Sequence, residues 1–213
     1  HELKRVYKLM RDISKDQVIV DLMALKYDYH NLKVLLKERE LQKDMSHLYI
    51  SIGATDFQKI KDGLIEGNFK DMQPEYREAI EAVLKDFEIT KDPQRIDLIL
   101  DKYYFEHLYK MAEDTGIELF VNYVKDMIDF TNIKSSIRLK KQEKDIGFFE
   151  EVILPNGNID KDVILFTLND SIENMINRFK NSRISSKLIK GLEDYKTTNK
   201  LSNLEKNMED YLV

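Results

Sequence analysis

Apolar residues recur every three or four positions along most of this chain, which is the spacing of one face of an α-helix. The clearest stripe lies in the segment 17–43, at Leu22, Leu25, Tyr29, Leu32 and Leu36. The same spacing predicts further helices over about 3–13, 117–141, 160–168, 171–180, 184–195 and 201–213. The pattern therefore predicts an all-α protein without a central sheet.

Short signals mark where other helices begin. Thr55 and Gln58 have the spacing of a capping box, so we expect a helix to open there. Pro74 suits the first turn of the next helix. Asp92 followed by Pro93 combines an N-cap residue with a proline at the first helical position, which predicts a third start.

Two features interrupt the helical pattern. Gly116 is expected to end the helix that begins at Pro93. Periodicity is then lost between Phe148 and Asp160, where Pro155-Asn156-Gly157 predicts a turn. Within this irregular stretch, 152–154 is apolar and is predicted to be a short extended piece.

The chain contains an internal repeat. The segment 28–33 reads Asp-Tyr-His-Asn-Leu-Lys, and the segment 129–134, which lies 101 positions later, reads Asp-Phe-Thr-Asn-Ile-Lys. Each copy lies in a long predicted helix that is followed by an apolar loop with a glycine, at Gly53 and at Gly157. Helical repeats stack their apolar faces on one another and usually build a curved scaffold with a concave surface.

The shared residues have a structural and a functional interpretation. On a helix, Asp28, Asn31 and Leu32 share a face that excludes Lys33. In the structural interpretation, the buried Asn bonds the backbone of a neighbouring helix and the Asp reaches a Lys or Arg. In the functional interpretation, the motif contacts a partner directly. The candidate motif residues are Asp28, Tyr29, Asn31, Lys33, Asp129, Phe130, Asn132, Lys134 and Arg138.

A third copy is predicted to open near the end of the chain. Glu205, Glu209 and Tyr211 have the same mutual spacing as Asp97, Asp101 and Tyr103, which lie in the helix before the second copy. We therefore expect repeat one at 1–92, repeat two at 93–200 and the start of repeat three at 201–213. An incomplete third repeat would leave the apolar face of 211–213 uncovered, which predicts that the chain self-associates or is less stable than a chain extended through the third repeat.

Composition narrows the function classes. Charged residues make up 34% of the 213 positions and the net charge is −5, which disfavours a general nucleic-acid binder. With no Cys, disulfide frameworks, thiolate metal sites and Cys nucleophiles are excluded. The sequence has no uninterrupted apolar run of the roughly 20 residues that a membrane-spanning helix needs.

Catalytic signatures are missing from the sequence. None of its four His residues belongs to a zincin or di-iron motif, and no glycines have the spacing of a phosphate-binding loop. The basic residues Lys140, Lys141 and Lys144 continue from Lys134 and Arg138. They are interpreted either as a solvated helix end or as a contact for an acidic partner or anionic lipid. We expect a protein without catalytic residues, metal or cofactor.

These residues resemble one family. The segment 26–37, Lys-Tyr-Asp-Tyr-His-Asn-Leu-Lys-Val-Leu-Leu-Lys, looks like a signature of the C subunit of the A/V-type rotary ATPases, which is called the d subunit in eukaryotic V-ATPases. The segment 116–120 followed by 129–134 and Arg138 is similar to the second repeat of that family. Because the family has three repeats and is longer, the resemblance implies a chain truncated at both ends.

The resemblance implies an all-helical, funnel-shaped protein with pseudo-threefold repeats. It implies a non-catalytic rotor adapter that links the central stalk to the proteolipid rotor ring, transmits torque for proton or sodium ion transport, and lies on the cytoplasmic face of the membrane. It would touch the membrane only through the complex and would bind no nucleic acid. The alternative is a generic helical-repeat scaffold for protein interactions.

Overall fold

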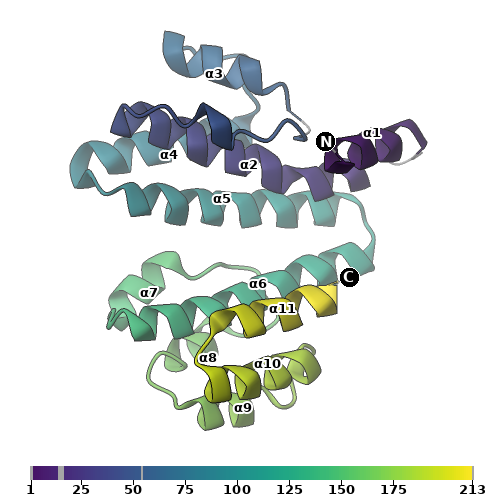
Figure 1. Ribbon diagram of the computed structural model, residues 1–213, viewed down its shortest axis with the longest axis vertical. Coiled ribbons are helices and arrows are strands. Elements are labelled where there is room, and N and C mark those ends of the chain that lie inside the picture. Colours follow the sequence, from purple (N-terminus) through teal and green to yellow (C-terminus); the bar gives the residue numbers. More distant parts are fainter. Residues whose placement is uncertain (1, 14–16, 54, 213) are drawn as a thin grey trace. The chain divides into compact units, whose positions relative to one another are not determined.

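The computed structural model describes residues 2–13, 17–53 and 55–212, and this part of the chain is helical without a strand (Figure 1). The all-α prediction is thereby confirmed.

The chain divides into two compact units, unit 1 at 1–115 and unit 2 at 116–213. The elements of unit 1 are α1 (Glu2–Ile13), α2 (Gln17–Leu41), η1 (Ser46–Leu48), α3 (Phe57–Glu66), α4 (Pro74–Thr90) and α5 (Pro93–Asp114). The elements of unit 2 are α6 (Glu118–Lys141), α7 (Ile146–Val152), α8 (Lys161–Phe166), α9 (Ile172–Phe179), α10 (Ser185–Thr198) and α11 (Leu201–Leu212).

Unit 1 is built around α2. Helix α5 packs along α2, α4 packs on α5, and α1 and α3 make smaller contacts with α2 (Figure 1). Leu32 and Leu36 of α2 are fully buried, as are Ile80 of α4 and Leu100 of α5. Because neighbours cover several faces of α2, the buried set extends well beyond the single stripe that the sequence predicts.

Unit 2 is built around α6. Its main core joins Phe130, Ile133 and Ile137 of α6 to buried residues of α9, α10 and α11. A second cluster, around Phe149 of α7 and Ile164 of α8, covers the C-terminal end of α6. Each unit therefore has a long central helix whose buried residues include most of the repeated segment.

The predicted starts and stops are confirmed at four residues. Helix α4 begins with Pro74 and α5 with Pro93. The Asp92 side chain accepts a hydrogen bond of 2.9 Å from the backbone N–H of Gln94. Gly116 follows the end of α5 with a φ of 66°, a left-handed conformation that glycine adopts at little cost.

Two local predictions are wrong. The stretch predicted to be irregular from Phe148 begins inside helix α7, and Val152 ends that helix instead of starting an extended piece. The helix forms because the Asp145 side chain caps the N–H of Phe148 and because Phe149 is buried in the core. The Thr55 capping box does not form: its hydroxyl donates to Tyr76 Oη at 3.0 Å, and no side chain caps α3.

Candidate functional site: two helix–strap junctions

The repeated asparagine fastens the segment that follows each long helix. Asn31 on α2 is 3% exposed, donates to the carbonyl of Ile50 at 2.7 Å and accepts from the N–H of Ile50 at 2.8 Å. Asn132 on α6 is 2% exposed and makes the same pair of bonds with Leu154, at 2.9 and 2.8 Å. We call residues 49–53 with Thr55 the first strap and residues 153–159 the second strap. The asparagines therefore bind these straps and not, as expected, the backbone of a neighbouring helix.

The repeated aspartate binds the same strap one turn earlier along each helix. Asp28 accepts from the N–H of Thr55 at 3.3 Å and from Tyr76 Oη at 3.1 Å. Asp129 accepts from the N–H groups of Asn158 and Ile159, at 3.0 and 3.1 Å. These described partners are neutral, whereas a Lys or Arg was expected. The reason is burial: both carboxylates are 1% exposed, in an interior where backbone amides and a phenol are at hand.

A glycine in each strap lies against the aspartate. A Cβ placed on Gly53 would lie 1.8 Å from Asp28 Oδ1, and a Cβ on Gly157 would lie 2.1 Å from Asp129 Oδ1. Real Cβ atoms do not approach an oxygen so closely, so any larger residue must displace the strap or the carboxylate. Each junction thus combines the same three residue types, Asp, Asn and Gly.

Burial perturbs the ionisable groups of both junctions. Desolvation, followed by the nearby charge of Asp126, raises the pKa of Asp129 from 3.8 to about 6, against the lowering effect of the two strap N–H groups. Desolvation also raises the pKa of Tyr29 and of Tyr76 well above the usual value for tyrosine. Burial lowers the pKa of His107, whose Nδ1 lies 3.2 Å from Tyr29 Oη.

The aromatic residue of each motif is a core residue. The Tyr29 ring packs against Tyr76, Tyr104 and His107, with centroids 5.6 to 5.9 Å away. The Phe130 ring packs edge-on against Tyr211 at 5.5 Å. Tyr211 is thus partly covered within unit 2, contrary to the expected uncovered face; the side chain of Leu212 and all of Val213 lie outside the described residues.

The basic residues of the motif join each long helix to the helix that packs along it. Lys33 pairs with Asp101 at 2.5 Å in unit 1, and one turn on, Lys37 pairs with Asp97 at 2.6 Å. In unit 2, Glu205 Oε1 of α11 lies 3.5 Å from Lys134 Nζ and 3.7 Å from Arg138 Nη2. Arg138–Glu205 thus corresponds to Lys37–Asp97 under the expected equivalence of the helices around 97 and 205, whereas Lys134 pairs with Glu205 and not with Glu209, the counterpart of Asp101. Helix α11 packs inside unit 2. Whether 201–213 also opens a third repeat stays a prediction.

The rest of the basic cluster is largely engaged within unit 2. Lys140 Nζ donates to the carbonyl of Asp170, and Lys141 Nζ donates to the carbonyl of Asn199 at 3.0 Å. The Lys144 ammonium lies 5.0 Å from the centroid of the Phe148 ring. These contacts favour the interpretation of the basic cluster as a helix end. They speak against a basic surface that is free to bind an acidic partner or anionic lipid.

Sequence reasoning missed the residues that complete the junctions. Tyr76, Asn158, Asp126 and Arg183 were not singled out, because they lie far along the chain from the motif or share no spacing with it. The sequence identified the strap glycines only as loop residues. Gly53 follows Asp28 by 25 positions and Gly157 follows Asp129 by 28, and this similar spacing was the signal that could have linked each glycine to its aspartate.

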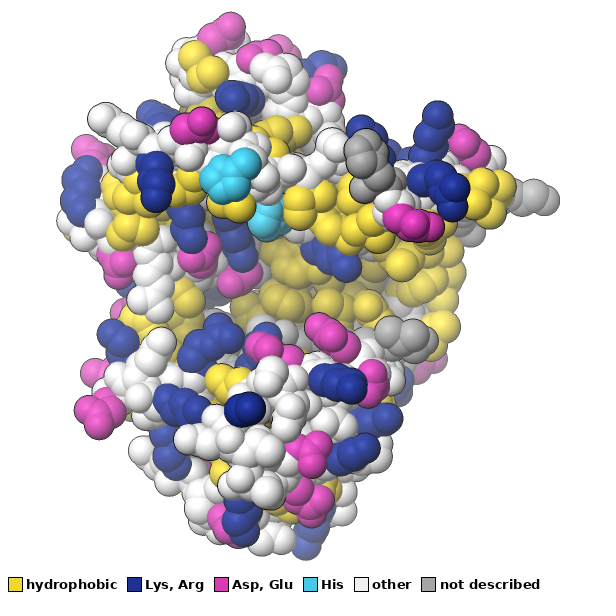
Figure 2. Space-filling view, in the orientation of Figure 1, with side chains coloured by type: hydrophobic (Ala, Val, Ile, Leu, Met, Phe, Trp, Pro, Cys, Tyr) yellow, Lys and Arg dark blue, Asp and Glu magenta, His cyan; other side chains and the backbone are white. Residues whose placement is uncertain are grey.

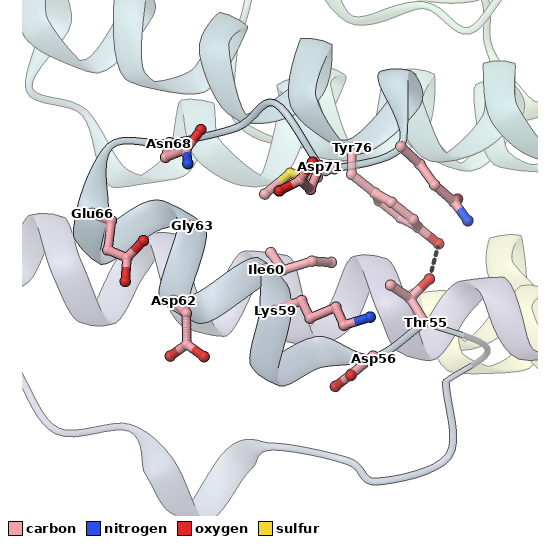
Figure 3. Close-up of a pocket in the computed structure, with 12 residues that line it drawn as sticks. Thr55, Asp56, Lys59, Ile60, Asp62, Gly63, Glu66, Asn68, Asp71 and Tyr76 are labelled. Atoms are coloured by element: carbon pink, nitrogen blue, oxygen red, sulfur yellow. Dashed lines mark hydrogen bonds between the residues drawn. The ribbon is translucent and has the colours of Figure 1, made fainter.

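Unit 1 also contains an open hollow of about 610 Å³ beside α3 (Figure 3). Its charged lining residues are mostly acidic, and the Lys59 side chain extends toward Thr55, whose hydroxyl bonds Tyr76. Among the described residues, no group of three or more His, Cys, Asp or Glu could hold a metal ion. Nor does any described helix have the length and apolar character needed to cross a membrane.

Comparisons with known proteins agree with one another. The family model described as "ATP synthase (C/AC39) subunit" matches residues 1–213. The chain is 27% identical to the C subunit of the V-type sodium ATPase of Enterococcus hirae over 164 residues, which are 77% of this chain and 50% of that protein. It is 25% identical to the C subunit of the A-type ATP synthase of Methanobrevibacter smithii, covering 90% of this chain and 53% of that protein. Against the corresponding A-type protein of Methanocaldococcus jannaschii the identity is 23%, with 99% of this chain and 56% of that protein covered. The chain spans about half the length of the curated relatives it matches.

Proposed function

The chain belongs to the ATP synthase (C/AC39) subunit family, and on that basis we propose that it acts as a non-catalytic adapter in an A/V-type rotary ATPase. In this proposal it links the central stalk to the proteolipid rotor ring and transmits torque during ATP-coupled ion transport. It lies on the cytoplasmic face and touches the membrane only through the complex.

The pair of helix–strap junctions supports the mechanical part of this proposal. An adapter that passes torque must resist shear between its helices, and each junction ties a long helix to its following strap by short, largely buried hydrogen bonds. Ion pairs such as Lys33–Asp101 and Lys134–Glu205 add a second connection to a neighbouring helix. Such features favour a rigid mechanical part over a flexible binding module.

The nine motif residues have a structural role in this proposal. They hold each unit rigid, and the partners bind surfaces that these units present. This favours the structural interpretation of the motif over direct partner contact, because Asp28, Asn31, Asp129 and Asn132 are at most 3% exposed.

Affinity purification from detergent-solubilised membranes tests the proposal. A tagged chain, expressed in its own cell, is expected to bring down stalk subunits and the proteolipid ring. Asn132→Leu should reduce this recovery, whereas Asn122→Leu, a control on the same helix whose amide makes one exposed contact of 3.4 Å, should not. Recovery of a folded chain with unrelated soluble proteins and no ATPase subunit would favour the alternative, a generic helical-repeat scaffold.

The non-catalytic part of the proposal has its own assay. We expect the purified chain to show no ATP turnover above that of a mock purification. Turnover that follows the chain through every purification step would return an enzymatic function to consideration.

A further inference from the structure

A buried carboxylate in unit 2 lies outside the shared motif. Asp126 on α6 is 2% exposed and lies one turn before Asp129. By the 101-residue offset of the repeat, its counterpart in unit 1 is Leu25, which is also 2% exposed. Unit 2 thus places a charged group where unit 1 has an ordinary core residue, so the repeat alone does not account for Asp126.

Three segments distant in sequence converge on this carboxylate. Arg183, in the turn before α10, donates from Nε to Oδ2 at 2.9 Å. Tyr211, near the end of α11, donates to the same oxygen at 3.1 Å. Asn158 of the second strap donates from Nδ2 to Oδ1 at 3.1 Å.

Asn158 further connects this group to the helix–strap junction. Its side chain binds Asp126 while its backbone N–H binds Asp129, so one strap residue spans both carboxylates. The charged and titratable groups around the site are Asp129 and Lys125 of α6, Arg183 and Tyr211.

We propose that Asp126, Asn158, Arg183 and Tyr211 form a latch that couples the C-terminal end of α11 to the turn at Arg183 and to the second strap. Only the carboxylate of this ion pair is buried, since the Arg183 side chain is 49% exposed. Leaving the buried Asp126 charge without its partners is costly, so the three donors fix the geometry around it. The latch therefore sets where α11 lies and makes its detachment depend on the other two segments. The latch does not depend on the proposed torque-transmitting function. If the chain does transmit torque, the latch passes a displacement of α11 on to the second strap.

Hydrogen exchange measured by mass spectrometry on the whole 213-residue chain tests the latch. Asp126→Leu, which copies the unit 1 residue, should speed exchange in peptides covering 206–212, 181–187 and 157–160 by roughly tenfold. Peptides from the middle of α10 and from α2 should keep their protection. Tyr211→Phe removes only one hydroxyl, leaves the core intact and should produce the same pattern at smaller amplitude.

Coupling is distinguished from simple loss of contact by Asn158→Ala. Among the hydrogen bonds of the described residues, Asn158 reaches α11 only through Asp126, yet this substitution should also speed exchange at 206–212. Glu205→Gln is the matched control on α11, since it removes the two ion pairs with Lys134 and Arg138, which lie outside the latch, and it should leave exchange at 181–187 and 157–160 unchanged. Unchanged exchange in all latch variants, or uniformly faster exchange throughout unit 2, would overturn the proposal.

Discussion

At the scale of single residues, the chain relies on buried polar side chains that are bonded to backbone. Asn31 and Asn132 each exchange two hydrogen bonds with one strap residue, as a neighbouring strand would. The adjacent aspartates accept further strap N–H groups. Such groups hold a loop in one position, and they leave unpaired partners behind when they are removed.

Replacing either asparagine by leucine should therefore be costly. We expect Asn31→Leu and Asn132→Leu each to lower the free energy of unfolding by about 1–3 kcal/mol, because the backbone groups of Ile50 or Leu154 lose their partners. Urea denaturation measures the change, with Asn122→Leu on α6 as the control. If both variants matched the control, the fastening role of the asparagines would be wrong.

The strap glycines make a second prediction. We expect Gly53→Ala and Gly157→Ala to destabilise the protein by about 1–3 kcal/mol each, because the new methyl group overlaps a bonded carboxylate. Gly147→Ala is the matched control: it lies in α7, its Cβ would meet nothing closer than 3.4 Å, and alanine favours the helix. Thermal melts of the three variants provide the comparison, and equal melting temperatures would contradict the close approach.

Asp129 predicts a pH dependence with a definite sign. Its folded pKa of about 6 lies above its ordinary value of 3.8, so between these values the folded state binds the proton more strongly. Stability from this group is therefore fully present below pH 3.8 and is lost as the pH rises through about 6, by about 3 kcal/mol for a displacement of this size.

The test is a difference between two proteins across pH. The free energy of unfolding of the wild type minus that of Asp129→Asn should decrease between pH about 4 and 7 and stay level above pH about 7. Asp210→Asn, an exposed carboxylate on α11, controls for the loss of one charge. A constant difference across the range would mean that the pKa of Asp129 in the folded protein is close to its ordinary value of 3.8.

At the scale of elements, α1 differs from the other helices. Its inward contacts come mainly from buried Tyr7, with Met10 packed beside it. Leu3, Val6, Leu9 and Ile13 are 41 to 71% exposed, and Figure 2 shows hydrophobic side chains gathered over this part of unit 1. An apolar helix face in water favours association.

We therefore expect the chain to self-associate through α1 at high protein concentration. Light scattering after size exclusion should report a mass that rises with concentration, and Leu9→Lys combined with Ile13→Lys should restore the monomer. Ile89→Lys on α4, which changes a residue that is 80% exposed outside α1, is the control. A monomer at every concentration would show that this face does not associate.

At the scale of the whole molecule, the chain consists of two units that each have their own long helix, strap and core. Small domains of about 100 residues can fold alone when they bury a continuous core. The boundary at 115/116 coincides with the left-handed Gly116. The repeat boundaries expected from the sequence, 1–92, 93–200 and 201–213, divide the chain differently and stay predictions.

This organisation predicts that the units fold separately. Residues 1–115 and 116–213, expressed alone, should each show helical circular dichroism and a cooperative melt. By contrast, a cut at 92/93 should leave 1–92 without α5, which packs along α2, and should abolish cooperative unfolding. Cooperative melting of 1–92 would show that α5 is dispensable to unit 1.

Local patterns in the sequence were enough to predict most of the helices and to reveal the motif that recurs after 101 positions. Apolar spacing is set by helical geometry, and caps such as Asp92-Pro93 act within a few residues, so both are readable along the chain. What the motif binds became visible only in the folded chain, because Asp28 meets Tyr76 and Asp126 meets Arg183 across 48 and 57 positions. The same holds for the helix at 146–152, where burial of Phe149 outweighs a weak local pattern. Contacts between distant segments depend on packing, and packing leaves no fixed spacing in the sequence.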